Sequence, residues 1–289
     1  PAGENIMHIR YKSHFISGYG VAGVALLAFW LFIAIFGSLL SPYSPDLYVA
    51  KPFLAPSASH WLGTNDVGQD VASQLIAGAR TSLLVAAGAA TLSTFLAMLF
   101  AAIPAFWGGF ANRLSSRIID IGLVIPPILA AMLAAAYLQP GPRLLIGLLA
   151  FFFWPGTGRI VRAQTLLLKT SAHVDASRSF GASPFYLFWR HIFPDLFPTL
   201  AATIIHDARR AVFLEAGLAF LGISDPTAQS WGRMIQQALA FTYMDAWRWW
   251  LISPGFAIST TILGLGLSGT ILERANHSDT TAKTYRRMQ

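Results

Sequence analysis

The run GVAGVALLAFWLFIAIFGSLL at residues 20–40 decides the fold class, because its 21 residues include no charged side chain. An α-helix rises ~1.5 Å per residue, so about 20 apolar residues cross the ~30 Å hydrocarbon core of a bilayer. The run is too long for the apolar region of a signal peptide, and no small-residue cleavage signal follows it. We therefore expect it to be a retained membrane anchor.

Further apolar runs indicate that the chain crosses the membrane several times. Hydrophobic residues make up 55% of the 289 residues and charged residues only 11%, which excludes a disordered chain and argues against a soluble globule. The runs are too long and too evenly apolar for barrel strands, which leaves helices as the spanning elements. We expect an all-α polytopic membrane protein with six transmembrane helices, at residues 20–40, 82–107, 118–138, 144–158, 199–223 and 250–272.

Lys and Arg residues gather on one side of this six-span pattern. That side carries 13 of the 20 basic residues and the opposite side carries 5. An excess of Lys and Arg marks the cytoplasmic side, and it explains the net charge of +7 without a nucleic-acid partner. The sequence thus predicts a cytoplasmic N-terminal segment (1–18), a transmembrane domain (19–272) and a cytoplasmic tail (273–289).

The inner segment 159–198 is long for a connection, and long connections usually have a function. Its first part predicts a polar helix from Arg159 to about Phe180. Gly181 suits the left-handed position that follows a helix. Asp175 and Arg178 are spaced to form an ion pair on that helix.

The second part of this segment predicts another short helix. Ser183 is a good N-cap and Pro184 a good first helical residue, while Pro194 is expected to end the helix near Ile192. Its aromatic residues allow two interpretations: an amphipathic helix lying on the membrane, or a knob that docks in a groove of a partner. The aromatic residues are Phe185, Tyr186, Phe188 and Trp189.

The motif His173-Val-Asp-Ala-Ser-Arg-Ser-Phe-Gly181, followed by His191-Ile-Phe-Pro194, resembles the "EAA" loop of ABC importer permeases. It is most similar to the C-type permeases of the dipeptide, oligopeptide and nickel group, although Asp175-Ala-Ser replaces the usual Glu-Ala-Ala. Other ordered motifs extend the resemblance over roughly residues 20–272. They are Trp61-Leu-Gly-Thr-Asn-Asp-Val-Gly-Gln-Asp70, Gly78-Ala-Arg-Thr-Ser-Leu83, Arg117-Ile-Ile-Asp120 with Ile125-Pro126, Arg159-Ile-Val-Arg-Ala-Gln164, Glu215-Ala-Gly-Leu-Ala-Phe-Leu-Gly222 and Ser230-Trp-Gly232.

The resemblance implies a type I ABC importer permease fold in a bacterial inner membrane. It implies a homologous permease subunit, two ABC ATPase subunits and an extracytoplasmic substrate-binding protein as partners. The cargo would be peptides or nickel and other metal chelates. The 159–198 segment would then be a coupling loop that seats in an ATPase through Asp175, Ala176, Arg178, Gly181, Ser183, Pro184, Tyr186, Trp189 and Pro194.

Several enzyme and cofactor classes have no support in the sequence. None of the four lysines follows a glycine, so the chain has no Walker A loop, and ATP–Mg is expected on the partner subunits. We expect no catalytic activity, cofactor or metal site in this chain. The absence of cysteine excludes disulfides and thiolate metal sites.

The fifth expected span carries the charged or titratable residues His206, Asp207, Arg209, Arg210 and Glu215. One interpretation is structural: an ion pair between Asp207 and Arg210 that holds helices together, or a span with shifted boundaries. The other is a polar lining of the substrate path, suited to a zwitterionic peptide or a carboxylate-rich chelate. Glu215 lies in a family-like motif, which favours a packing or gating role.

Four weaker features have simple structural interpretations. The segment Gly264–Gly269 fits GxGxxG but lies in an apolar span, where small residues serve helix packing. We expect His60 to be polar surface rather than a metal ligand, and Asp120 to pair with Arg117. The tryptophans near residue 250 predict an interfacial belt. They are Trp247, Trp249 and Trp250.

Two other functions compete with that of an importer permease. A secondary transporter usually shows inverted repeats and broken helices at mid-membrane, and the sequence shows no convincing repeat. A membrane assembly or sensor protein would explain a docking loop but not the charges within a span.

Overall fold

The computed structural model describes residues 2–223 and 225–286, with side chains described within 18–223 and 225–269. The regular secondary structure of this part of the chain is helical, apart from one isolated antiparallel bridge between Thr64 and Asp70. Four of its helices are long and apolar enough to cross a membrane, or five if a bent pair forms one span. The predicted all-α membrane class is confirmed. Judged by helix length and apolar composition, however, the described residues contain fewer than the six predicted spans.

The chain forms two compact units, Pro1–Val85 with Val212–Gln289, and Ala86–Ala211. The helices α2 (Val71–Ala97) and α9 (Phe193–Phe220) each contribute one part to each unit. The first unit also contains α1 (Ala2–Leu40), α10 (Trp231–Leu239), α11 (Trp247–Trp250) and α12 (Ile252–Arg286). The helix α12 thus includes most of the segment expected as a tail.

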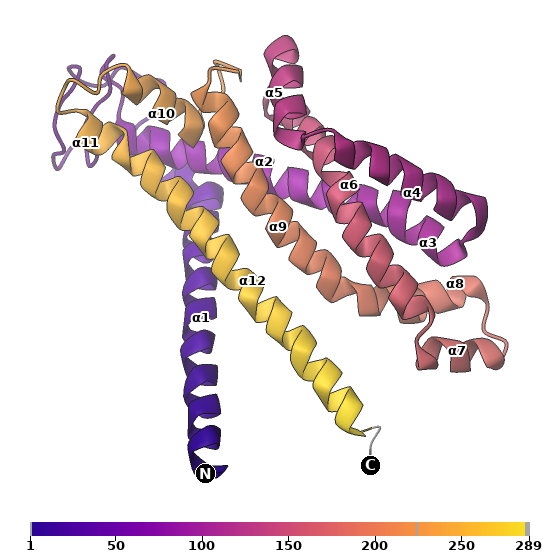
Figure 1. Cartoon of the computed structure of the whole chain (residues 1–289). Helices are drawn as coiled ribbons and strands as arrows, with labels where there is room; N and C mark the ends of the chain where they lie inside the picture. Colours follow the sequence, from indigo (N-terminus) through magenta and orange to yellow (C-terminus); the bar gives the residue numbers. More distant parts are fainter. Residues whose placement is uncertain (1, 224, 287–289) are drawn as a thin grey trace. The chain divides into compact units, whose positions relative to one another are not determined.

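The helices α1 and α12 pack against each other (Figure 1), and two glycines, Gly23 and Gly264, lie at their contact. A Cβ atom on Gly23 would lie 2.6 Å from the Leu267 Cβ and 3.0 Å from the Gly264 carbonyl oxygen. No larger side chain fits there without a backbone shift, as in other close helix contacts in membranes. Small-residue packing is therefore the role of Gly264, as the sequence predicts.

Tryptophans form the core of the first unit. Trp30 and Trp231 meet edge to face with ring centroids 5.0 Å apart, and Trp250 stacks on Phe241 at 5.7 Å. The exposed fraction of Trp250 is 0%, so the prediction of an interfacial belt is wrong for this residue. Its ring is buried in an apolar cluster and is not exposed at the surface of this unit.

The segment between α1 and α2 is an ordered loop that ends at Asp70. The Asp70 carboxylate accepts a hydrogen bond from the Ser73 backbone N–H at 2.8 Å, which caps α2 and starts it before the predicted residue 82. Its other oxygen lies 3.0 Å from the His60 Nδ1. His60 is buried and stacks on Tyr43, so the prediction of a surface histidine is wrong.

The second unit is built around α6 (Pro142–Lys169). It includes the π-helical turn η1 (Met98–Ala102), α3 (Ile103–Trp107), α4 (Gly109–Val124) and α5 (Pro127–Leu138). It also contains α7 (Ala172–Ser179), α8 (Pro184–Leu187) and a second π-helical turn, η2 (Phe188–Ile192).

The third expected span, residues 118–138, is not one helix. The helices α4 and α5 meet at 77°. Ile125 and Pro126 between them have extended backbone conformations, with ψ of 120° and 114°. The helical conformation is disfavoured before a proline, and here two prolines follow each other.

The fourth expected span, residues 144–158, is part of a longer helix. The helix α6 runs through Pro155 and Gly156 to Lys169, so it continues well past the predicted end at residue 158. Gly122 makes room for the proline ring, since a Cβ atom there would lie 2.7 Å from the Pro155 Cγ. The separate helix predicted from Arg159 to Phe180 is likewise replaced by the end of α6, a turn and α7.

Each π-helical turn lies just before a proline. The backbone N–H of Ile103 bonds to the Met98 carbonyl, and that of Phe193 to the Phe188 carbonyl, both five residues back. The wider turn accommodates a proline at the next position. Pro194 therefore does not end the helix near Ile192, contrary to the prediction, and helical structure continues from Pro184 to Phe220.

Candidate functional site

The turn after α7 has the geometry that the sequence predicts for Gly181. Gly181 has a φ of 83°, a conformation that favours glycine. Its N–H bonds to the Arg178 carbonyl at 3.0 Å, and the N–H of Ala182 bonds to the Ser177 carbonyl at 3.1 Å. This pair of bonds is a Schellman motif, which fixes the direction in which the chain leaves α7.

The start of α8 also follows the local rules of its sequence. The Ser183 Oγ accepts a hydrogen bond from the Tyr186 N–H at 3.3 Å, and Pro184 is the first helical residue. The N-cap and the Schellman motif lie two residues apart. Together they define the two ends of the turn between α7 and α8.

Side-chain contacts hold α7 against η2 and the start of α9. The His173 Nε2 lies 3.1 Å from an Asp195 carboxylate oxygen, and the Ser177 Oγ lies 3.4 Å from the His191 Nε2. The rings of His173 and His191 are 5.8 Å apart. Residues 170–193, hereafter the α7–α8 segment, are thus one packed body, which Figure 1 shows at the end of α6.

The inner side of the α7–α8 segment belongs to the core of the second unit. Phe188 is 1% exposed and packs on Phe106 and Trp107, each with ring centroids 5.2 Å away. Val174, Leu187 and Ile192 are equally buried in the same apolar cluster. The prediction that Phe188 contributes to an aromatic surface is therefore wrong.

The outer side of the α7–α8 segment exposes large apolar side chains. The exposed fractions are 91% for Phe180, 67% for Phe185, 51% for Tyr186 and 47% for Trp189. A cavity of about 310 Å³ lies among the side chains of residues 183, 185, 186, 189 and 190. Exposed apolar patches of this kind mark sites of interaction with proteins or membranes.

The remaining predicted coupling residues lie on or near this outer side. Asp175 and Arg178 form the predicted ion pair at 2.9 Å, with both side chains about half exposed. Ala176 is exposed on α7, and Pro194 is exposed in the first turn of α9. The structure thus places the sequence-predicted set on the α7–α8 segment, except Pro194, which follows it by one residue.

A buried carboxylate on α9 joins three helices of the second unit. Asp207 is 0% exposed, and one of its oxygens accepts hydrogen bonds from the Ser93 Oγ at 2.8 Å and the Thr157 Oγ1 at 2.6 Å. Its other oxygen lies 3.4 Å from an Arg210 nitrogen. The predicted pair of Asp207 and Arg210 is confirmed. The two hydroxyl donors are not evident from the sequence, because small polar residues in an apolar run carry no specific signal.

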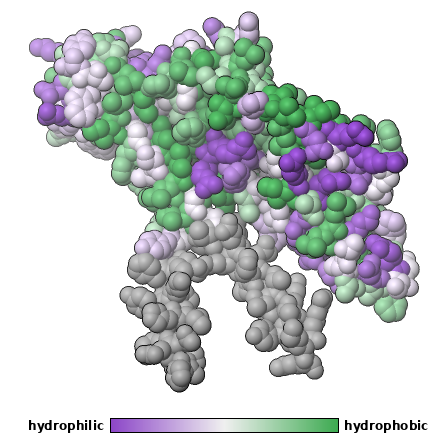
Figure 2. All heavy atoms as spheres, in the orientation of Figure 1, coloured by the Kyte–Doolittle hydropathy of each residue, from purple (hydrophilic) through white to green (hydrophobic). Residues whose placement is uncertain are grey.

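Two arginines, Arg209 and Arg210, lie partly exposed on α9 in the next turn after His206 and Asp207. The Arg210 guanidinium lies 4.4 Å from the centre of the Phe153 ring, a cation–π contact, and its side chain is 32% exposed. The Arg209 Nη2 lies 3.3 Å from the Nδ1 of the exposed His206. Figure 2 shows a hydrophilic patch over the middle of α9.

Glu215 belongs to the first unit and has a different environment. The residue is 3% exposed, and its carboxylate accepts a hydrogen bond from the Ser82 Oγ at 2.9 Å. Next to it, a Cβ atom on Gly232 would lie 2.5 Å from the Ala216 carbonyl oxygen. These contacts lock α9 against the start of α10, which is consistent with a packing role.

Asp120 has a different partner from the expected one. Its carboxylate lies 3.0 Å from the Arg159 Nη2, and both side chains are about 60% exposed. The prediction of a local pair with Arg117 is therefore wrong, because the end of α6 brings Arg159 alongside α4.

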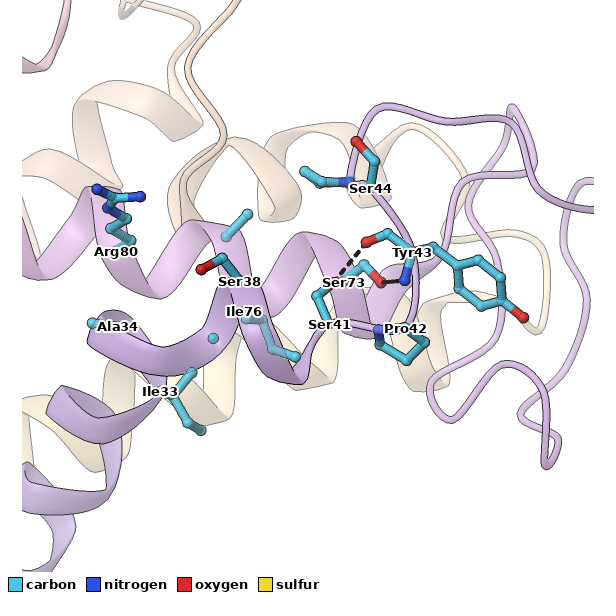
Figure 3. A pocket seen from close by; sticks show the side chains of 13 residues that line it. Ile33, Ala34, Ser38, Ser41, Pro42, Tyr43, Ser44, Ser73, Ile76 and Arg80 are labelled. Carbon is cyan, nitrogen blue, oxygen red and sulfur yellow. Dashed lines mark hydrogen bonds between the residues drawn. The ribbon is translucent and has the colours of Figure 1, made fainter.

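A cavity of about 460 Å³ lies between α1 and α2 in the first unit. Figure 3 shows Ser41, Pro42 and Tyr43 at one end of it and Arg80 toward the other. Ile33 and Ile76 supply part of its apolar wall. Among the described residues, no group of three His, Asp or Glu side chains is placed to hold a metal ion.

The match to a family model identifies the class of protein. Residues 93–280 match the model described as "Binding-protein-dependent transport system inner membrane component". The chain belongs to this family of ABC importer permeases. Both the α7–α8 segment and the cluster around Asp207 lie largely within the matched residues.

Curated relatives place the permease in the peptide branch of this family. A protein provisionally named a peptide permease in Brucella suis biovar 1 is 34% identical over 88% of this chain and 85% of its own length. The dipeptide permease DppC of Bacillus subtilis is 33% identical over 88% of this chain and 80% of its own length. The oligopeptide permease OppC of the same organism is 32% identical, with coverages of 92% and 87%. The permease is thus a multi-pass protein of the inner membrane, of a class that works with ATPase and substrate-binding partners.

Proposed function

We propose that this permease is one of two transmembrane subunits of an ATP-driven importer for peptides, which an extracytoplasmic binding protein delivers. The observation that carries the proposal is the α7–α8 segment, whose inner side is locked into the helical core and whose outer side exposes aromatic rings. Such a body can transmit force between two subunits. The relatives named for dipeptide and oligopeptide transport support peptides as the cargo.

We infer that α9 is a true span despite its charges, which brings the count to six with the bent α4–α5 pair. Asp207 is buried among donors and Glu215 is buried among hydroxyls, so neither acid is presented to lipid. The excess of basic residues on one side supports cytoplasmic termini and a cytoplasmic α7–α8 segment.

The outer side of the α7–α8 segment is the proposed contact with an ABC ATPase. Tyr186 and Trp189 border the small cavity there, and large aromatic residues commonly carry most of the energy of an interface. Gly181, Ser183 and Pro184 set the orientation of this surface rather than contribute area to it. ATP–Mg would bind to two such ATPase subunits, and this chain would hydrolyse nothing itself.

The polar residues of α9 are the proposed lining of the translocation path. Exposed charges on a spanning helix are costly in contact with lipid, so the face that carries His206, Arg209 and Arg210 is best placed toward water. The buried Asp207 holds Arg210 in position on this face. A related permease subunit would supply the opposite wall, and metal chelates remain a second predicted class of cargo.

The proposal is tested by assembly and transport measurements on the complete complex. Purified with its partner subunits, the permease should retain the ATPases and support uptake of peptides that depends on ATP. Replacing both Tyr186 and Trp189 by Ala should remove the ATPases while the permease pair stays assembled. Tyr243→Ala is the matched control, because this residue is 80% exposed in the loop between α10 and α11 and should leave ATPase retention unchanged. Uptake that persists without ATP would instead indicate a secondary transporter.

A further inference from the structure

The hydrophilic patch on α9 carries more positive than negative charge. Arg209 and Arg210 are both partly exposed, whereas the nearby acid, Asp207, is fully buried. The patch lies over the middle of α9 (Figure 2). Arginine side chains in a membrane face water or a charged partner rather than lipid.

The single acid of the cluster is already occupied. Asp207 accepts hydrogen bonds from Ser93 and Thr157 on one oxygen and interacts with Arg210 through the other. These donors leave the carboxylate little capacity to attract a cationic ligand. Its remaining effect is to hold one guanidinium group in place.

Each guanidinium group contacts a residue in the preceding turn of α9. Arg210 is held by Asp207 and by the Phe153 ring. Arg209 can only donate, so in its contact with His206 the Nδ1 atom must be the acceptor. Two guanidinium groups that are held this way retain N–H donors for a further acceptor, and their planar fork matches a carboxylate.

We propose that Arg209 and Arg210 form a binding station for the terminal carboxylate of a peptide in transit, with Asp207 as the positioning residue for Arg210. The proposal rests on the proposed function in peptide import. An ammonium group would be repelled by the two arginines, so the station distinguishes the two ends of a peptide.

The test compares one transported peptide with its C-terminal amide in vesicles that contain the whole complex. Binding-protein loading is measured separately and set equal for both peptides. One charge-assisted hydrogen bond is commonly worth a factor of about ten, so the free acid should enter at least about tenfold faster than the amide. Arg209→Gln and Arg210→Gln should each slow the free acid toward the rate of the amide, with little change for the amide.

Two further variants separate recognition from folding. Asp207→Asn should lower the ratio of the two rates while its amide keeps contact with Ser93 and Thr157. Arg113→Gln removes one positive charge from an exposed position on α4 and should leave the ratio unchanged. Arg210→Lys keeps the charge without the fork and should restore part of the preference.

The possible outcomes are distinct. A wild-type complex that imports both peptides equally would overturn the station but not the importer, whereas a complex with no ATP-dependent uptake would overturn both. Equal slowing of both peptides in Arg210→Gln would show a structural role only. Loss of the partner permease subunit in the arginine variants would place the arginines at a subunit interface. An uptake rate that depends on anionic lipid content in the wild type but not in Arg210→Gln would assign the arginines to a lipid phosphate. Each of these two results would overturn the proposal.

Discussion

Two Asp-x-x-Arg pairs in the second unit have the same spacing and opposite environments. Asp175 and Arg178 lie 2.9 Å apart, with side chains 55% and 48% exposed. Asp207 and Arg210 lie 3.4 Å apart, with side chains 0% and 32% exposed. The shorter pair is the weaker one, because water and salt screen it, whereas the longer pair belongs to a network that joins three helices.

The two pairs also differ in their surroundings. The first pair lies on the α7–α8 segment, which also carries exposed aromatic rings such as Phe185 and is expected in water. The second pair consists of a buried acid and a partly exposed arginine, on a helix expected in the membrane. Aromatic rings are thus expected in water in the first region, and charged groups within the membrane in the second. Both arrangements are unfavourable by themselves, and in each region the local structure holds the side chains in place. Spacing alone does not reveal this contrast.

Removing the buried acid should have the largest effect on stability. Asp207→Ala leaves Arg210 without its partner and two buried hydroxyls without an acceptor, which should cost about 3 kcal/mol or more. The measurement is the midpoint of thermal unfolding in detergent, with Asp207→Asn expected to lie between the variant and the wild type. Unchanged stability of Asp207→Ala would show that the two pairs are energetically alike.

Neighbouring aromatic residues of the α7–α8 segment should separate docking from folding. Phe185→Ala should weaken ATPase retention by roughly tenfold or more without a change in the unfolding midpoint, because Phe185 is 67% exposed. Phe188→Ala should instead lower the free energy of unfolding by about 3 kcal/mol, since Phe188 is 1% exposed. The check is ATPase co-purification alongside thermal unfolding. Equal loss of stability in both variants would contradict the division into an inner and an outer side.

The turn that orients the outer side should have a moderate effect. Gly181→Ala meets no atom within 4 Å, so its cost of about 1 kcal/mol comes from the positive φ alone. Gly147→Ala is the matched control: it also meets nothing within 4 Å but lies inside α6, where alanine should stabilise by about 0.5 kcal/mol or more. The midpoint of thermal unfolding should fall for Gly181→Ala and rise for Gly147→Ala. An unchanged midpoint for Gly181→Ala would count against a strained turn.

The exposed pair should have the smallest effect on stability. Asp175→Ala should change the free energy of unfolding by less than about 0.5 kcal/mol, because the pair is exposed and screened. Asp245→Ala provides a comparison, since Asp245 and Arg248 form another exposed pair with the same spacing at 3.2 Å. Similar unfolding midpoints are expected for both variants. A large loss for Asp175→Ala alone would show that this pair contributes to folding and not only to the surface.

Local rules predict the parts of the fold that depend on neighbouring residues. Gly181 and Ser183 behave as their residue types suggest, since a left-handed turn and an N-cap need only a few adjacent residues. The exposed ion pair of α7 is likewise a matter of spacing. The motifs that carry the family resemblance are also local in sequence, and the family match confirms the family that they indicate.

Prolines and buried partners show where such rules fail. Pro155 does not end α6, because Gly122 on another helix leaves space for its ring. Pro194 does not end a helix, because η2 widens the preceding turn. The donors to Asp207 lie 114 and 50 residues away in the chain, so only tertiary structure brings them together. Sequence could therefore suggest the pair with Arg210 but not the network.

The central claim is that the outer side of the α7–α8 segment contacts an ATPase, and site-directed cross-linking tests it most directly. The chain has no cysteine, so a single one introduced by Tyr186→Cys provides a unique attachment point for a photoactivatable cross-linker. The account predicts an adduct with the ATPase that changes in yield when nucleotide is added, and none from Tyr243→Cys. Labelling of lipid at Tyr186→Cys, or an ATPase adduct from Tyr243→Cys instead, would contradict it.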